Sequence, residues 1–181
     1  MKPFITWDEL VRQAAEDIGE NQHLEGCEKL DKAETLGGET DVTLFLRAQA
    51  NLLRGLSLRS KSSLEMAARC LERLRDPSDH ETIKQLKTAT AVAICNMEVS
   101  EMQRAVGKID SEHRQMMPQG CAFDPGVYAR RRILAKIRLR TAVCDALRLD
   151  PDNQEIVHLK QELNSTIERD IRVFELNHGC F

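Results

Sequence analysis

Apolar residues recur at spacings of three and four along almost the whole chain of 181 residues. Leu10, Ala14 and Ile18 illustrate this spacing, which places them on one face of an α-helix. No segment shows the strict two-residue alternation of a half-buried strand, nor a hairpin dipeptide between β-branched runs. We therefore predict an all-α fold of about eight helices, over approximately 6–19, 23–36, 40–56, 64–75, 80–97, 102–109, 127–149 and 156–176.

Helix-breaking residues divide these segments into four consecutive pairs. Gly37-Gly38, Asp76-Pro77 and Asp150-Pro151 are typical helix ends, because glycine and proline interrupt helices and aspartate favours turns. The serine-rich stretch 57–63 indicates a loop. We predict a stack of antiparallel helical hairpins in a single domain over 1–181, with a C-terminal capping helix. A hinge is expected at 115–126, where proline and glycine are concentrated.

Composition excludes several classes of protein. With 41% hydrophobic and 30% charged residues the chain is typical of a globular protein, and its net charge of −3 does not favour a general nucleic-acid binder. No run of eighteen apolar residues or signal-peptide pattern is found. The six cysteines are widely and irregularly spaced. We therefore expect a cytoplasmic or nuclear protein with free thiols in a reducing compartment.

A recurring spacing suggests an internal repeat. Leu139, Val143, Ala146 and Pro151 are spaced 0, +4, +7 and +12, and the same helical spacing recurs elsewhere, at Gly26, Leu30, Ala33 and Gly38, and at Ala67, Leu71 and Leu74. A small residue in such a set lets two helix backbones approach closely. The pattern resembles the second half of a tetratricopeptide repeat over about two-thirds of the chain.

The resemblance has departures. Leu139 stands where the family prefers a small residue, the seventh helix is long for half a repeat, and its start lacks the family's Trp, Gly and Tyr signature. What the resemblance implies is a groove that receives a short peptide or helix from a partner protein. The alternative is an irregular helical bundle whose helix ends imitate the motif.

No catalytic or metal-binding motif was found. The five histidines form no H-E-x-x-H motif, the cysteines form no C-x-x-C pair, and glycine-rich phosphate loops and nucleophile elbows are missing. We therefore predict no enzymatic activity, no metal and no cofactor. A small helical enzyme whose site is assembled from distant residues stays an alternative.

The strongest charge feature is the segment 128–140, which holds six basic residues and no acid. Three interpretations compete. The basic residues pair with acids of the last helix, such as Glu155, Glu162 and Glu168; they recognise an acidic peptide or carboxylate; or they contact the phosphates of a nucleic acid. Scarce aromatic residues (4%) argue against stacking on single-stranded bases.

Together these observations predict a protein–protein interaction module, of the adaptor or co-chaperone-like scaffold type, that binds a partner peptide or helix. We expect the groove to be lined by basic residues of two segments: Arg47, Arg54, Arg131, Lys136 and Arg138. The alternative partner is a nucleic acid bound by the basic helix, and no membrane partner is expected.

Overall fold

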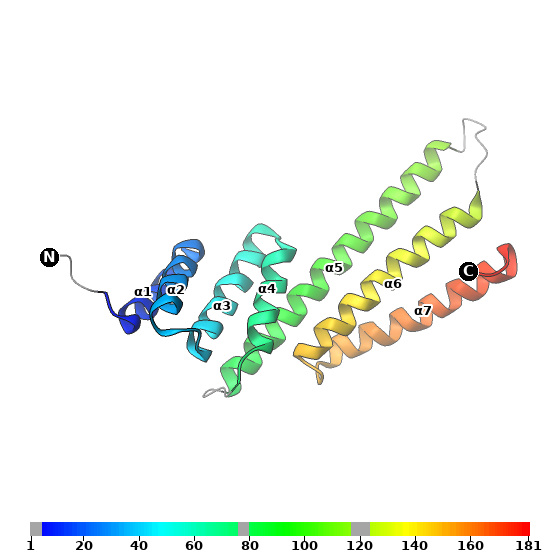
Figure 1. Cartoon of the computed structure of the whole chain (residues 1–181). Helices are drawn as coiled ribbons and strands as arrows, with labels where there is room; N and C mark the ends of the chain where they lie inside the picture. Colours follow the sequence, from blue (N-terminus) through cyan, green and yellow to red (C-terminus); the bar gives the residue numbers. More distant parts are fainter. Residues whose placement is uncertain (1–4, 76–79, 117–123) are drawn as a thin grey trace. The chain divides into compact units, whose positions relative to one another are not determined.

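The computed structural model describes residues 5–75, 80–116 and 124–181, and these ranges contain helices and connecting turns without any strand. The all-α prediction is confirmed. Seven helices are present in this part of the chain (Figure 1): α1 (Trp7–Gly19), α2 (His23–Gly37), α3 (Asp41–Leu58), α4 (Lys61–Glu72), α5 (His80–Met116), α6 (Pro125–Leu149) and α7 (Gln154–His178). Among the described helices, none has a stretch long and apolar enough to cross a bilayer.

The helix count is seven where the sequence predicted about eight. The difference lies in α5, a continuous helix over His80–Met116 in place of the two helices expected at 80–97 and 102–109. The residues between them, Glu98 to Glu101, include no glycine or proline. A weak apolar stripe was mistaken for a break, but backbone hydrogen bonding continues wherever no residue interrupts it.

The chain divides into two compact units, residues 1–93 and 94–181, with the boundary inside α5. The single domain over 1–181 therefore stays a prediction. The predicted hinge at 115–126 falls mainly on 117–123, which are outside the described residues.

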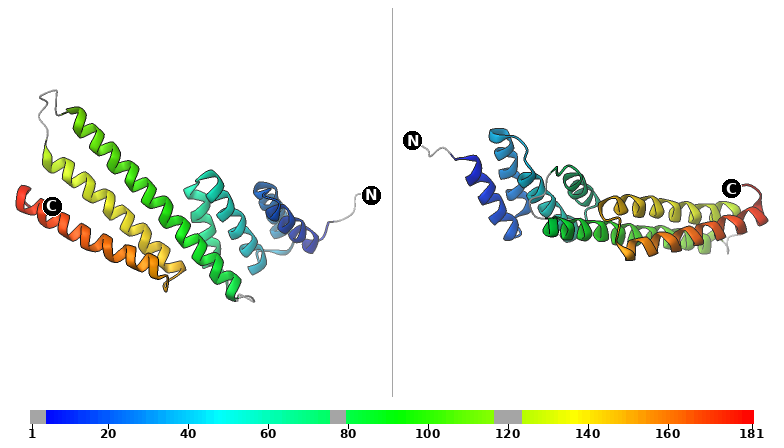
Figure 2. Two further views of the ribbon diagram at one scale, coloured as in Figure 1. Left: turned by 180° about the vertical axis from the view of Figure 1, so that it is seen from behind. Right: turned by 90° about the horizontal axis from the view of Figure 1, so that it is seen from below.

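The first unit contains two helical hairpins. α1 packs against α2, α3 packs against α4, and α2 contacts α3 (Figures 1 and 2). One face of α1, α2 and α3 supplies the central cluster of buried side chains: Ala14, Ile18, Leu30, Leu46 and Ala50. The amphipathic spacing predicts Ala14, Ile18 and Leu30 of this core correctly, because each helix can bury its apolar stripe only against a neighbour.

Two glycines let the hairpins close. A Cβ atom on Gly26 of α2 would lie 2.7 Å from Ile18 Cγ1, and one on Gly55 of α3 would lie 2.4 Å from Leu64 Cδ2. Both distances are far below van der Waals contact. Gly26 therefore allows α1 and α2 to approach closely, and Gly55 plays the same part in the second hairpin.

The serine-rich stretch 57–63 is mostly helical, contrary to the predicted loop. α3 continues to Leu58 and ends at Arg59, whose φ of 50° is left-handed. α4 begins at Lys61, with the Ser60 side chain accepting a hydrogen bond from the Ser63 backbone N–H. Serine at an N-cap satisfies a helix donor, so one of these serines starts a helix instead of filling a loop.

The second unit contains the α6–α7 hairpin, whose turn was predicted at Asp150-Pro151. α6 ends at Leu149, and the Asn153 side chain caps α7 by accepting a hydrogen bond from the Ile156 backbone N–H at 3.2 Å. Asn153 also donates to the buried Asp150 carboxylate at 3.1 Å. Large apolar side chains of both helices are buried in this unit: Ile133, Leu139, Val143, Ile156, Leu163 and Ile167.

The glycine contacts give a test of hairpin packing. Gly55→Ala is expected to lower the free energy of unfolding by about 1 kcal/mol or more, because overpacking against the fully buried Leu64 outweighs the gain in helix propensity. Gly107→Ala is the matched control, since nothing lies within 4 Å of its Cβ position on α5. It should raise stability by up to about 1 kcal/mol. Urea denaturation of both variants measures the difference, and equal effects would contradict the close approach.

Candidate functional site

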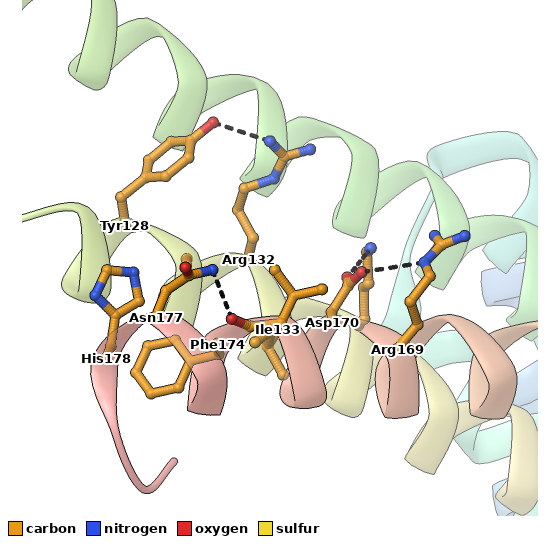
Figure 3. A pocket seen from close by; sticks show the side chains of 11 residues that line it. Tyr128, Arg132, Ile133, Arg169, Asp170, Phe174, Asn177 and His178 are labelled. Atoms are coloured by element: carbon orange, nitrogen blue, oxygen red, sulfur yellow. Dashed lines mark hydrogen bonds and ion pairs between the residues drawn. The ribbon is translucent and has the colours of Figure 1, made fainter.

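An open pocket of about 400 Å³ lies between α6 and α7 in the second unit (Figure 3). Its wall carries three basic side chains and one carboxylate, together with apolar and aromatic groups. It is lined by Tyr128, Ala129, Arg132, Ile133, Lys136, Arg169, Asp170, Val173, Phe174, Asn177 and His178. This volume is within the usual range of ligand pockets, roughly 300–1,000 Å³.

Helical periodicity brings these side chains to one place. Tyr128, Arg132 and Lys136 follow one another at four-residue intervals on α6. Arg169, Val173 and Asn177 do the same on α7. Residues four apart are neighbours on one face of a helix, so each helix presents a row of three side chains to the pocket.

Asp170 is the acceptor at the charged end of the pocket. Lys136 Nζ lies 2.5 Å from Asp170 Oδ2 and joins α6 to α7. Arg169 Nε lies 3.8 Å from the other oxygen, Oδ1, and its side chain is 72% exposed. Lys136 is therefore neutralised by a close ion pair, whereas Arg169 retains a solvent-facing guanidinium with only a distant carboxylate.

Arg132 and Tyr128 belong to a network that reaches α5. Arg132 Nη1 donates to the Tyr128 hydroxyl at 2.9 Å, and that hydroxyl donates to Asp110 Oδ1 at 2.8 Å. Arg132 Nη1 is also 3.6 Å from Asp110 Oδ1. This network fixes the aromatic ring and the guanidinium at the rim before any ligand arrives.

Apolar and aromatic groups form the rest of the pocket. Ile133 and Phe174 are almost fully buried, while Val173 is 53% exposed. The His178 ring lies 5.1 Å from the Phe174 ring, and Phe181 packs edge-on against Phe174 at 5.3 Å. Figure 3 shows Tyr128, Phe174 and His178 toward one end of the pocket, and Asp170 and Arg169 toward the other.

The three predicted binding residues on α6 point in different directions. Lys136 lines the pocket. Arg131 instead donates to Glu112 Oε2 of α5 at 2.7 Å, beside a smaller hollow of about 250 Å³ that also includes Ile109 and Met116. Arg138 is exposed and forms no ion pair or hydrogen bond with another residue in the described ranges.

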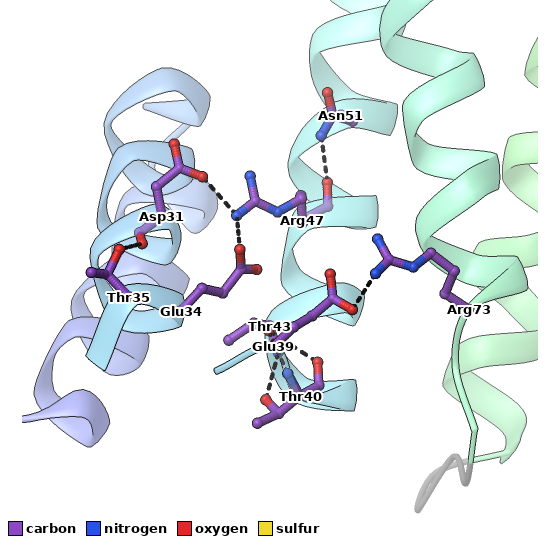
Figure 4. Close-up of polar contacts among 9 residues, drawn as sticks. All are labelled: Asp31, Glu34, Thr35, Glu39, Thr40, Thr43, Arg47, Asn51 and Arg73. Atoms are coloured by element: carbon purple, nitrogen blue, oxygen red, sulfur yellow. Dashed lines mark hydrogen bonds and ion pairs between the residues drawn. The ribbon is translucent and has the colours of Figure 1, made fainter. Parts of the chain in front are cut away.

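The two predicted binding residues of the first unit lie on α3. The Arg47 guanidinium reaches α2, where its Nη2 lies 2.8 Å from Asp31 Oδ1 and 2.9 Å from Glu34 Oε2 (Figure 4). Burial lowers the pKa of Arg47, but the hydrogen bonds and charges of the two acids outweigh it and raise that pKa above its ordinary value. Arg54, two turns further along, has a buried Nε without a hydrogen-bond acceptor among the described residues.

Three of the six basic residues of the segment 128–140 are paired within the second unit, as one of the three interpretations supposed, although with other acids than those named. Their partners are Glu112 and Asp110 of α5 and Asp170 of α7. In the described ranges no ion pair joins this segment to Glu155, Glu162 or Glu168, and Glu162 lies 3.3 Å from His158 instead. The sequence shows the charges but not which helix faces them.

Several residues of the pocket were not predicted from the sequence. Arg132 belongs to the basic segment 128–140 but was not among the predicted binding residues, and Arg169 and Asp170 lie outside that segment. The four-residue rows on α6 and α7 were the signal that was present. Recognising them requires knowing that α6 and α7 pack together, which the short turn at Asp150-Pro151 already indicated.

Three cysteines of the described ranges do not provide an activated nucleophile. Burial raises the pKa of the Cys27 and Cys70 thiols. Burial, together with the charge of Glu98, raises the pKa of Cys95 to about 11. A thiolate is the reactive form, so these three side chains are held in the unreactive form near neutral pH. No group of three or more His, Cys, Asp or Glu that could hold a metal ion occurs among the described residues.

Comparisons of the chain with protein-family models, with curated proteins and with solved structures found no match. The similarity to tetratricopeptide repeats therefore stays a prediction from the sequence.

The contacts of Arg47 predict that it stabilises the first unit. Arg47→Met should lower the free energy of unfolding by about 1–2 kcal/mol, since it removes two charge-assisted hydrogen bonds and leaves the partly buried Glu34 unpaired. Arg138→Met is the matched control and should change stability by less than about 0.5 kcal/mol, as exposed positions usually do. Chemical denaturation measures both variants. Equal stability of the two would show that Arg47 does not join α2 to α3.

Proposed function

We propose that this protein is an interaction module that binds an acidic segment of a partner protein in the α6–α7 pocket. The observation that carries the proposal is the charge of the lining, which holds three basic side chains and one carboxylate, Asp170. Asp170 is paired with Lys136, and Asp110 of α5 lies 3.6 Å from Arg132, so Arg169 is the cation that an incoming carboxylate would pair with. Arginine suits this task because its planar guanidinium forms paired hydrogen bonds with a carboxylate.

The remaining features support a binding role of the adaptor or scaffold type. The pocket combines a few polar groups with apolar surface, which is the usual composition of recognition sites. The network of Arg132, Tyr128 and Asp110 orders the rim in advance, which reduces the entropy lost on binding.

Nucleic-acid binding is the weaker alternative. Arg131, Arg132 and Lys136 each lie beside a carboxylate of a neighbouring helix, so a phosphate would have to compete for them. The charge available for phosphate contacts is therefore smaller than the six basic residues of 128–140 suggest.

Selection of peptides from a randomised library tests the proposal. Peptides that bind the whole chain should be enriched in Asp and Glu, and the Arg132→Gln/Arg169→Gln double variant should bind them at least about tenfold more weakly. Arg148→Gln is the matched control, because Arg148 is 75% exposed on the last turn of α6 and pairs with Asp145. Isothermal titration calorimetry gives the affinities.

Two outcomes would reject this function. Selected peptides that are neutral or basic would exclude recognition of an acidic segment. Binding of duplex RNA or DNA that falls steeply with salt, with no peptide selected, would assign the basic helix to nucleic acid.

A further inference from the structure

The pocket has two chemically different ends along α7. Arg169 marks the charged end, and Figure 3 shows Phe174 away from it. Val173, one turn after Arg169, provides exposed apolar surface beside the buried Phe174. Four residues of helix correspond to a rise of about 6 Å. A ligand that uses both ends must carry an anionic and an apolar group separated by a similar distance.

Arg169 is the cation best placed to receive the anion. Its distance of 3.8 Å to Asp170 is too long for a hydrogen bond, and none of its N–H groups has an acceptor among the described residues. Lys136 already forms an ion pair with Asp170, and Arg132 donates a hydrogen bond to the Tyr128 hydroxyl. The exposed guanidinium of Arg169 therefore has both its charge and its paired donors available for a carboxylate.

Val173 provides the complementary apolar contact. Its side chain is 53% exposed although it lies beside Phe174, which is only 8% exposed. Covering such surface with an aliphatic side chain is favourable, at about 25 cal/mol per Å² of apolar area. The partner therefore needs an apolar side chain on the Val173 side and an acid on the Arg169 side.

The spacing suits an extended partner, and the size of the pocket favours it over a helix, whose residues four apart have the same rise of about 6 Å. In an extended strand, side chains two residues apart point the same way and are separated by about 6.6 Å, close to the rise between Arg169 and Val173. A docked helix would have a diameter of about 10–12 Å, which is wide for a pocket of about 400 Å³. Adjacent residues of an extended chain point to opposite sides and do not fit both ends.

We propose that the α6–α7 pocket binds an extended segment in which an apolar residue and an Asp or Glu are separated by one residue. This inference rests on the proposed function and specifies the partner's chemistry. Arg169 receives the carboxylate and Val173 contacts the apolar side chain. Lys136 pairs with Asp170 at the same end and offsets the charge of that carboxylate.

Short capped peptides provide the probes. The test peptides contain Leu-Ser-Glu or Glu-Ser-Leu between flanking serines, so both chain directions are covered. Matched peptides replace Glu with Gln, replace Leu with Ser, or place Leu and Glu next to each other. Titration into the whole chain, followed by NMR, should give millimolar affinity for the better test peptide and at least about fivefold weaker binding for each matched peptide.

Variants of the chain test which pocket residue contacts the acidic residue of the peptide and which contacts the apolar residue. Arg169→Gln should remove the preference for Glu over Gln while keeping the preference for Leu over Ser. Val173→Ser should remove the preference for Leu over Ser while keeping the preference for Glu over Gln. Arg172→Gln, an exposed change on the same helix outside the pocket, should alter neither preference. Circular dichroism checks that all three variants stay folded, and a shared loss of both preferences would show misfolding instead of lost contacts.

The outcomes separate this inference from the proposed function. Acidic peptides that bind through Arg132 and Arg169 without any preference for Leu or for its spacing would overturn the inference and leave the proposed function intact. If no acidic peptide binds and the library selection also gives none, both are wrong. Preferences that Val173→Ser and Arg169→Gln leave unchanged would place the ligand elsewhere on the chain.

Discussion

The packing of α6 along α7 is the constraint on which the proposed binding site depends. Near the turn the buried residues of α6 are Val143, Ala146 and Leu149. Toward the other end of the hairpin the facing residues are large, including Tyr128, Arg132 and Phe174. These long side chains hold their polar groups at the rim while their stems cover apolar surface. The pocket lies between the two helices at this end of the hairpin.

The packing of the helices places basic residues in two kinds of surroundings, beside acids of a neighbouring helix or exposed to solvent. Arg47 and Lys136 face acids on the adjacent helix and join α2 to α3 and α6 to α7. Arg169 and Arg138 are exposed and lack a hydrogen-bond acceptor within the described ranges. Ion pairs between partly buried side chains stabilise the fold, whereas an exposed cation beside apolar surface has charge available for a partner. Their surroundings, and not their frequency in the sequence, distinguish the two kinds of basic residue.

The sequence was sufficient for the local structure and insufficient for the pairing of side chains. Apolar spacing predicted the core residues Ala14, Ile18 and Leu30, and the Asp150-Pro151 turn was located correctly, because both depend on neighbours along the chain. The continuous α5 and the helical serines were missed, since a weak stripe and an N-cap resemble a break and a loop. The partners of Arg131 and Lys136 depend on which helices face each other, which periodicity does not specify.

The central claim is that an acidic segment binds in the α6–α7 pocket. The most direct measurement is an NMR titration of the whole chain, labelled at its isoleucine methyl groups, with an acidic peptide obtained by selection. Ile133 lines the pocket, whereas Ile18 lies in the core of the first unit. The account predicts a saturable shift of the Ile133 signal with the Ile18 signal unchanged. Saturable binding that leaves Ile133 unperturbed would contradict it.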